Sequence, residues 1–382
     1  MTLAVLLTAC AATPVRTVAS APQPVGPAIP GLDARQFGEP VPVPPVASLF
    51  KLTKEQEADF LHYFHDPRHA AEAPHQRLSA YLYQRLHGFR YYGPTQSAAD
   101  ALSTHEGNCL TLALVTTALA RLAEVEVAYQ RISDTPVFER NGNVVLVSEH
   151  VRSLLFDPGY TPEPGAVVLQ RPHIIIDYFP DRRRRAGGRV SEATLQSMYY
   201  SNLAGEAMAE SRNRDAYWLV RAALEQDPGN VGALNSLAVL HRRTGREDIA
   251  EALYAYALQR YGDSLTLLSN YRTLLQKQGR ESQAAELEQR LMLLPVGNPY
   301  DLVELGNYAF LQGRHQQALA FYGKALQHAP YLHEALWRQA VVYEALGRPE
   351  KAGELLMAAQ AAAGRAQDRR LYQAKALSLQ GH

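Results

Sequence analysis

The sequence has little cysteine and no surplus of charge. Only two cysteines, Cys10 and Cys109, occur in 382 residues, and 38 lysine and arginine residues balance 38 aspartate and glutamate residues. This balance weighs against nucleic acid as the main partner, because proteins that bind it usually carry a basic surplus. The chain also has no cluster with metal-ligand spacing, no phosphate loop and no nucleotide fingerprint, so it predicts neither a metal nor another cofactor.

Hydrophobic runs long enough to span a bilayer are missing at the N-terminus. Residues 1–9 are apolar, but a membrane span takes about 20 apolar residues, so this run suits a secretion signal instead. It has no lysine or arginine in front of it, and we therefore expect translation to start further upstream. Residues 11–48 are rich in proline, alanine and valine, a composition that favours an extended tether without a core.

The segment Leu7-Thr8-Ala9-Cys10 resembles the lipobox of bacterial lipoproteins, whose signal is cut before a cysteine that is then lipidated. The resemblance implies a signal peptide at 1–9 and a membrane anchor on Cys10. Ala11 and Ala12 follow, without the aspartate that retains lipoproteins of Gram-negative type in the inner membrane. The implied location is therefore the outer membrane, facing the periplasm.

If Cys10 carries lipid, Cys109 has no disulfide partner within the mature chain. A lone cysteine in an oxidising compartment is either buried and inert or kept as a reactive thiol. Gly107 and Asn108 are cap-type residues in front of residues 109–123, which predict a central helix buried on nearly every side. The first turn of a helix carries free N–H groups and partial positive charge, which lower the pKa of a thiol and can hold an oxyanion. The sequence therefore places Cys109 where a thiolate would be stabilised.

A thiolate nucleophile needs a base, and the base needs a third group that fixes its tautomer. Downstream of the central helix, β-branched and aromatic residues predict extended segments at 125–132, 143–147, 149–156 and 173–179. His150 lies in the third segment and is the candidate base. If Asp177 lies opposite His150 in an antiparallel hairpin, Phe156 lies opposite Arg171 and the turn falls on residues 161–165, which have turn chemistry. This register makes Asp177 the candidate orienting acid.

Three other residues compete for these roles. Asp157 continues the strand of His150 and would lie about 23 Å from it, at about 3.3 Å per residue, which is beyond contact. His173 shares a strand face with Asp177 but lies about 13 Å from it, so a structural or rim position is expected. His105 precedes the nucleophile by four residues and is expected to shape the approach to the site rather than to act as the base.

Together, Glu106-Gly107-Asn108-Cys109-Leu110 at a helix start and the later His150 and Asp177 resemble the transglutaminase-like branch of the papain-like cysteine enzymes, over about residues 50–190. The resemblance implies that Cys109 attacks an amide carbonyl, His150 protonates the leaving amine and Asp177 orients the imidazole. The thioacyl intermediate then passes to water, as in a peptidase or amidase, or to an amine, as in a cross-linking transferase. The sequence leaves these two outcomes open.

The surroundings of the proposed triad are less regular. Val151 and Arg152 stand where an aromatic residue usually follows the histidine, so the substrate contacts of better-known members are not carried over. The backbone N–H of Cys109 is the expected oxyanion donor. The side chain of Gln96 is a candidate second donor, although its position equally suits the start of a solvated helix.

Further elements are expected on both sides of these motifs. The capping box Thr53-Lys54-Glu55-Gln56 predicts a helix to about residue 65, and a second helix is predicted over about residues 74–86. Both are expected to pack around the central helix. Four arginines at 182–185 predict a solvated loop, with contact to anionic headgroups or glycan as the alternative.

The C-terminal half repeats every 34 residues, the length of a tetratricopeptide repeat (TPR), a helix-turn-helix unit. Small residues that let helices approach, or that end the first helix of a pair, recur in this frame at Ala216, Ala250, Ala284, Ala318, Ala352, Gly245, Gly279, Gly313 and Gly347. Five repeats and a capping helix at 366–379 predict a solenoid. Its concave face would take a protein or peptide. Asparagines on the first helices either clamp a peptide backbone there or are merely solvated: Asn202, Asn235, Asn270 and Asn307.

These patterns predict an α+β transglutaminase-like/papain-like domain followed by an all-α TPR solenoid, each with its own core. The expected divisions are a signal peptide at 1–9, a tether at 10–48, the cysteine-enzyme domain at 49–196, five repeats at 197–364, and a capping helix with the C-terminus at 365–382. Two functions stay open. One is an envelope-anchored, cysteine-dependent acyl-transfer enzyme whose repeats recruit a protein or peptide, and the other is a non-catalytic adaptor lipoprotein that scaffolds an envelope protein complex.

Overall fold

The structure is a computed structural model that describes residues 28–32, 34–91, 94–141, 144–162, 171–177, 186–294, 299–311 and 313–380. The predicted signal peptide at 1–9, the predicted lipidation site at Cys10 and the arginine run at 182–185 lie outside the described residues. Within the described ranges, no helix is both long and apolar enough to cross a membrane.

Helices precede the sheet, and the predicted ones are confirmed. The capping box forms as expected: the N-cap Thr53 side chain accepts from the Gln56 N–H, and the Gln56 side chain accepts from the Thr53 N–H. The elements are η1 Ala34–Phe37, α1 Val46–Leu49, α2 Lys54–Phe64, η2 Pro67–His69, α3 Pro74–Arg85, α4 Ala98–Thr104 and α5 Cys109–Leu122. Helices α2, α3 and α4 pack around α5, which is the predicted central helix.

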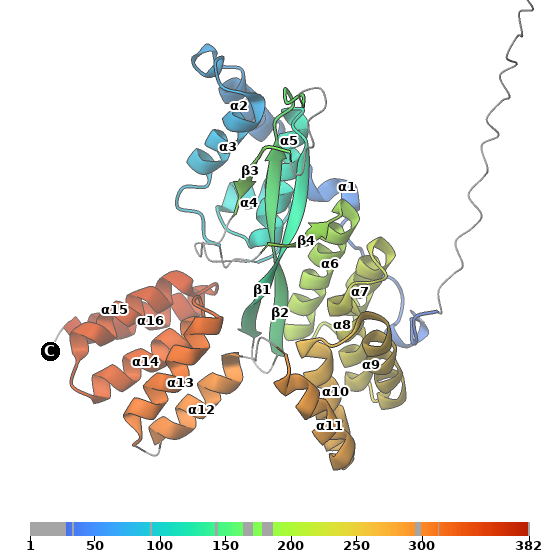
Figure 1. Cartoon of the computed structure of the whole chain (residues 1–382), viewed down its shortest axis with the longest axis vertical. Coiled ribbons are helices and arrows are strands. Elements are labelled where there is room, and N and C mark those ends of the chain that lie inside the picture. The colour runs from blue at the N-terminus through green and yellow to red at the C-terminus, as the bar shows by residue number, and fades with distance from the viewer. Residues whose placement is uncertain are drawn as a thin grey trace, which may run out of the picture.

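The sheet has four antiparallel strands in the order β3-β2-β1-β4, namely β1 Val127–Asn141, β2 Val144–Phe156, β3 His173–Ile176 and β4 Ala186–Val190. The two segments predicted at 143–147 and 149–156 form one strand, β2. Strand β4 was not predicted, because Gly187 and Gly188 have low strand propensity; the residues on either side of them, Ala186 and Arg189, pair with β1. Beyond β3 and β4, β1 and β2 continue as a long hairpin toward the solenoid (Figure 1).

The C-terminal half forms the predicted solenoid of helix pairs (Figure 1). The pairs are α6 Glu192–Ala209 with α7 Asn213–Gln226, α8 Val231–Arg243 with α9 Glu247–Tyr261, α10 Leu265–Lys277 with α11 Glu281–Met292, α12 Pro299–Leu311 with α13 His315–His328, and α14 His333–Ala345 with α15 Pro349–Ala362; α16 Ala366–Gln380 follows. The alanines that recur every 34 residues are buried in the solenoid. The four glycines have φ between 70° and 78° and end the first helices, as predicted.

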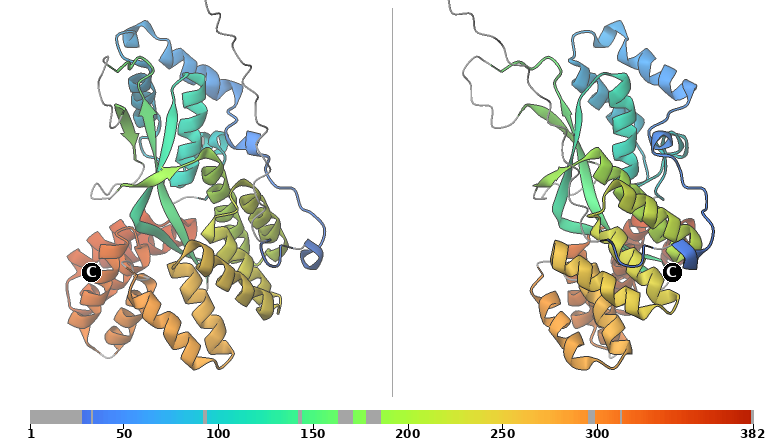
Figure 2. Two further views of the ribbon diagram at one scale, coloured as in Figure 1. Left: turned by 45° about the vertical axis from the view of Figure 1, so that its right-hand side comes forward. Right: turned by 90° about the vertical axis from the view of Figure 1, so that its right-hand side faces the viewer.

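The described part of the predicted tether is not an extended segment without a core. The ring of Phe37 stacks on Tyr217 of α7 with centroids 4.2 Å apart. Nearby, His241 of α8 bonds through Nε2 to the Gly31 carbonyl at 2.9 Å, and the Tyr200 hydroxyl donates to the Pro44 carbonyl at 2.6 Å. The expectation is therefore wrong for residues 28–48, because the few aromatic and polar groups among the prolines find partners on the solenoid. Figure 2 shows this segment running along the solenoid helices.

The expected border between two separate cores is also wrong. One continuous cluster of buried residues runs from Phe37 through α5 and the sheet to Leu287 in α11, and separate clusters lie among α12 to α14 and α14 to α16. Helix α6 begins at Glu192, so the border expected at residue 196 falls inside it. Because α6 contacts α5, β1 and β2 as well as α7 and α8, the first repeat belongs to both halves of the protein.

Candidate functional site

Helix α5 presents Cys109 as its first residue. The Asn108 side chain caps the helix by accepting from the N–H of Thr111 at 3.0 Å. All but two of the residues of α5 are buried, so the helix is fixed in the core and its first turn has a defined position. Cys109 is 9% exposed, at the end of α5 where free N–H groups and the helix dipole favour an anion.

Strand β2 brings His150 to Cys109. Asp177 is the residue that follows β3, and it contacts His150. His150 is fully buried, and its Nε2 atom lies 2.9 Å from Oδ1 of Asp177. The side chains of His150 and Cys109 also interact, since each shifts the pKa of the other. The structure thus brings together all three residues of the predicted triad.

The predicted register that led to Asp177 is wrong by two residues. Phe156 pairs with His173 rather than with Arg171, so the continuation of β3 sets Asp177 opposite Arg152. Successive side chains alternate between the two faces of a strand, so a shift of two residues keeps Asp177 on the face of His150. The pair therefore meets diagonally instead of directly across the hairpin.

The electrostatics of the site favour a charged thiolate and imidazolium. Burial by itself would raise the pKa of the Cys109 thiol, but the hydrogen bond and charge of His150, together with the N–H groups of Val151 and Leu110, lower that pKa overall. Burial by itself would lower the pKa of His150, but hydrogen bonds and charges from Asp177 and Cys109 raise it to about 9. The two groups stabilise each other, so a proton moves from sulfur to imidazole below the ordinary pKa of a thiol.

Arg152 and Gln130 support the acid, and the sequence did not single them out for this role. The guanidinium of Arg152 donates to Oε1 of Gln130 at 2.7 and 3.0 Å. The Nη1 atom of the same guanidinium lies 4.0 Å from Oδ2 of Asp177. Gln130 in turn donates to the Gly187 carbonyl of β4 at 3.2 Å. Arg152 was noted only as a departure from the expected aromatic residue, and only the pairing of β1, β2 and β4 reveals what it contacts.

Gln96 lies beside the first turn of α5. Its main-chain N–H donates to the Thr111 hydroxyl at 3.0 Å, and its side-chain oxygen accepts from the Thr104 hydroxyl at 3.0 Å. The first contact ties its backbone to the helix that carries Cys109, and the second fixes the orientation of its amide. The role of oxyanion donor stays a prediction for both Gln96 and the N–H of Cys109.

The competing residues have other partners. His105 ends α4 with φ of 57° and bonds through Nε2 to the Arg85 carbonyl at 3.0 Å. His173 bonds through Nδ1 to the Arg171 carbonyl at 2.9 Å. Asp157 lies 3.6 Å from Nδ1 of a different histidine, His75. The contact of His173 fits the structural or rim position expected for it, and the role of His105 in shaping the approach to the site stays a prediction.

The groove asparagines do not form one uniform row. Asn270 of α10 donates to the side chain of Asn235 of α8 at 3.0 Å, so these two lie side by side on neighbouring first helices. Asn307 of α12 accepts from the Tyr322 hydroxyl of its own pair at 2.9 Å, and Asn202 lies on α6. Among the residues that the structure describes, no group of three or more histidine, cysteine or acidic side chains is placed to hold a metal ion.

Comparisons with known proteins concern only the helical half. No family model matches the chain, and no curated protein matches it. Among solved structures, the chain is similar to Pseudomonas aeruginosa pilF, with 18% identity and a TM-score of 0.28 over 50% of this chain and 90% of that one. It is also similar to PilW, described as a type IV pilus biogenesis factor, with 22% identity and a TM-score of 0.29 over 50% and 88% of the two chains.

A third similar structure is YrrB, described as a TPR protein with an unusual peptide-binding site, with 19% identity and a TM-score of 0.24 over 49% of this chain and 92% of that one. At TM-scores this low, the similarity by itself assigns neither a fold nor a function to this chain. The 34-residue period, the buried alanines and the glycine-ended first helices carry the assignment themselves. The helix pairs from α6 to α15 are a TPR solenoid.

Proposed function

We propose that the protein is a cysteine-dependent acyl-transfer enzyme whose TPR solenoid binds its protein or peptide substrate. The observation that carries the proposal is the placement of His150 between Cys109 and Asp177, with the pKa of the histidine raised to about 9 and that of the thiol lowered. Perturbed pKa values in a fixed nucleophile, base and acid arrangement are typical of catalytic sites.

In the proposed reaction, the thiolate of Cys109 attacks an amide carbonyl and forms the S–C bond. The imidazolium of His150 gives its proton to the nitrogen as the C–N bond breaks, so the amine leaves neutral. His150 then takes a proton from water or from an amine, which attacks the thioester and releases Cys109. Asp177 stabilises the imidazolium throughout and holds its Nε2 atom.

A second candidate is a non-catalytic adaptor in which the solenoid binds a partner and the sheet domain is a scaffold. The observation that favours it is the burial of the triad, since His150 is fully covered and Cys109 is 9% exposed. TPR solenoids act in protein interaction, so this function needs no reaction at Cys109.

A thiol probe separates the two candidates. We expect full-length protein with Cys10→Ser, which leaves Cys109 as its sole thiol, to be labelled by iodoacetamide-alkyne at pH 6.5. Labelling should be lost in Cys109→Ala and strongly slowed in His150→Ala, while His173→Ala, a nearby histidine with another partner, reacts normally. If His150→Ala is labelled as fast as the parent protein and Cys109→Ala fully complements a deletion strain, the results would support the adaptor instead.

The groove needs point variants, because a truncation at residue 197 would cut α6 and the shared core. If the protein is an adaptor, replacing Asn235 and Asn270 together by alanine should abolish complementation, whereas Cys109→Ala should not. If it is an enzyme, both changes should abolish it.

The location in the cell envelope is part of the same proposal. The support is Leu7-Thr8-Ala9-Cys10, with no aspartate after the cysteine. We expect the wild-type protein to fractionate with the outer membrane and Cys10→Ser to lose the lipid mass and the membrane association. A Cys10→Ser protein that still fractionates with the membrane would contradict the anchor.

A further inference from the structure

Glu206 of the solenoid reaches the loop beside the candidate nucleophile. It lies on α6, the first helix of the first repeat, and its Oε1 atom accepts from the main-chain N–H of Thr95 at 2.9 Å. Thr95 is 6% exposed, and a buried N–H group without an acceptor is costly. Glu206 therefore fixes the main chain of the loop in front of α4 from the solenoid side.

Thr95 passes this restraint to the cap of α5. Its hydroxyl oxygen accepts from the side-chain amide of Asn108 at 2.8 Å, and Asn108 uses its other side-chain atom to accept from the Thr111 N–H. Cys109 lies between Asn108 and Thr111 in the sequence. An N-cap side chain that is hydrogen-bonded through both its oxygen and its nitrogen has one orientation. Glu206, which is 111 positions from Thr95 in the sequence, therefore helps to fix the first turn of α5.

A second contact joins the same loop to the same helical turn. The N–H of Gln96 donates to the hydroxyl of Thr111, which is fully buried. Gly107 also lies close to this side chain, because a Cβ atom at Gly107 would lie 2.6 Å from the Thr111 methyl group. The loop held by Glu206 thus carries both Gln96, the candidate oxyanion donor, and Thr95, the partner of the N-cap residue Asn108.

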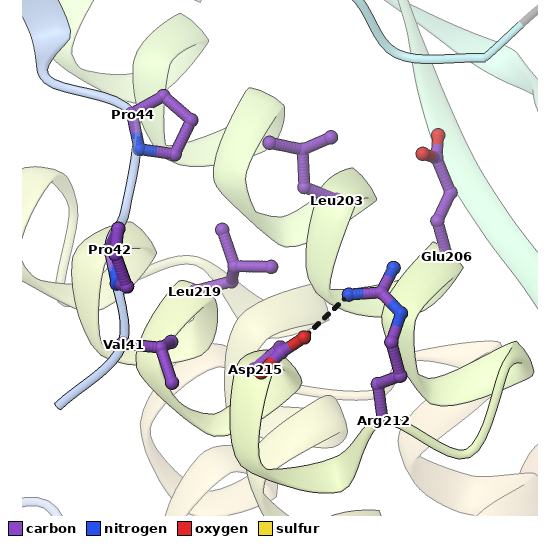
Figure 3. A pocket seen from close by; sticks show the side chains of 8 residues that line it. All are labelled: Val41, Pro42, Pro44, Leu203, Glu206, Arg212, Asp215 and Leu219. Atoms are coloured by element: carbon purple, nitrogen blue, oxygen red, sulfur yellow. Dashed lines mark hydrogen bonds and ion pairs between the residues drawn. The ribbon is translucent and has the colours of Figure 1, made fainter. Parts of the chain in front are cut away.

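Glu206 is also accessible from the solenoid side. It lines an open pocket of about 410 Å³ together with Leu203, Arg212 and Asp215, and Val41 and Pro42 of the N-terminal segment also line this pocket. Figure 3 shows Glu206 and Arg212 at one end of this pocket and the apolar side chains at the other. The carboxylate that holds Thr95 therefore stands where the sheet domain, the first repeat and the N-terminal segment meet.

We propose that Glu206 is a positioning residue through which the first repeat of the solenoid sets the reactivity of Cys109, acting by way of Thr95 and Asn108. The inference rests on the proposed function, because it gives the solenoid a part in building the reactive site as well as in recruiting the substrate. A repeat that only recruits would leave the reactivity of the thiol unchanged.

The test compares rates of Cys109 alkylation by iodoacetamide between pH 5 and 9, followed by intact mass, in full-length protein carrying Cys10→Ser. In Glu206→Ala we expect the rate at pH 7 to fall about fivefold, equivalent to about 1 kcal/mol, and the pH midpoint to rise. Glu206→Gln keeps the accepting oxygen without the charge and should react at nearly the wild-type rate. Glu210→Ala removes an exposed carboxylate after the same helix and should leave the rate unchanged.

The direction of the change distinguishes positioning from a loss of packing. If Glu206 only stabilised the fold, its loss would expose the buried thiol and speed alkylation, so a faster or unchanged rate in Glu206→Ala overturns the inference. Thr95→Ala removes the acceptor of Asn108 while keeping the main-chain bond to Glu206; it should slow alkylation in the same way and serves if Glu206→Ala fails to fold. Failure of the proposed function looks different, because the wild-type midpoint would then lie at the ordinary thiol value and would not respond to His150→Ala.

Discussion

Replacing Asp177 by asparagine is the most direct test of the ion pair in the site. Burial by itself would lower the pKa of His150, but the hydrogen bond with Asp177, the largest single influence in the opposite direction, and further contributions from Cys109 and the charge of Asp177 raise it from 6.5 to about 9. A tenfold change in an equilibrium corresponds to about 1.4 kcal/mol, so this rise represents roughly 3 kcal/mol. If Asp177 supplies about half, its neutral isostere should cost the imidazolium between 1 and 2 kcal/mol, or about tenfold in the population of the ion pair.

The sign of the pH dependence follows from the two groups. The ion pair exists above the lowered pKa of the thiol and below the raised pKa of the histidine, and the two titrations belong to the pair rather than to either residue. Wild-type alkylation by iodoacetamide should therefore be faster below the ordinary pKa of a thiol than alkylation of an ordinary thiol at the same pH. In Asp177→Asn we expect a rate about tenfold lower at pH 6 that approaches the wild-type rate above pH 9, where any thiol ionises.

The assay is the alkylation rate against pH, measured by intact mass on protein with Cys10→Ser. Circular dichroism at each pH serves as the control for folding, because His150 is fully buried. An Asp177→Asn profile that overlays the wild-type profile between pH 5 and 7 would refute the argument that Asp177 supports the imidazolium.

Three further predictions concern the solenoid and the segment docked on it. Phe37→Ala removes the ring that stacks on Tyr217 and should destabilise the protein by about 3 kcal/mol, seen in chemical denaturation; a change below about 1 kcal/mol would mean that the segment adds little. Burial lowers the pKa of His241, so the neutral histidine contributes its full stabilisation above pH 6.5 and this contribution is lost as the pH falls below that value. Proteolysis within residues 28–48 should therefore be faster at pH 5 than at neutral pH, and the acceleration should be smaller in His241→Gln. Ser211 has φ of 61° at the position where later repeats have glycine, so Ser211→Gly should raise the free energy of unfolding by up to about 1 kcal/mol, and a lower melting temperature would contradict this.

The candidate site was accessible from the sequence because its residues sit in strong local patterns. Cys109 follows a capping pair and opens an apolar run, and His150 lies in a strand-forming segment. Asp177 was found with a register that is off by two residues, and the choice survived because that error preserves the strand face. An error of one residue would have turned the side chain of Asp177 to the opposite face of the sheet.

The supporting contacts were not accessible in this way. Arg152 contacts Gln130 across the β1–β2 pair, and Glu206 contacts Thr95 from a helix far along the chain. Neither contact leaves a periodic or spaced pattern, since each depends on how distant elements pack. The docking of Phe37 was missed for the same reason, because a proline-rich composition reports the stiffness of the chain and not whether a partner surface exists.

The sequence by itself determined the helix starts, the 34-residue solenoid and the choice of a candidate nucleophile and a candidate base, since caps, periods and strand propensities act between residues close in the chain. Only the tertiary structure decided the strand register, the addition of β4, the shared core around α6 and the contact from Glu206 to the loop beside Cys109. These features arise when buried surfaces far apart in sequence must fit together, and their geometry is fixed by packing and by the need to satisfy buried hydrogen-bonding groups.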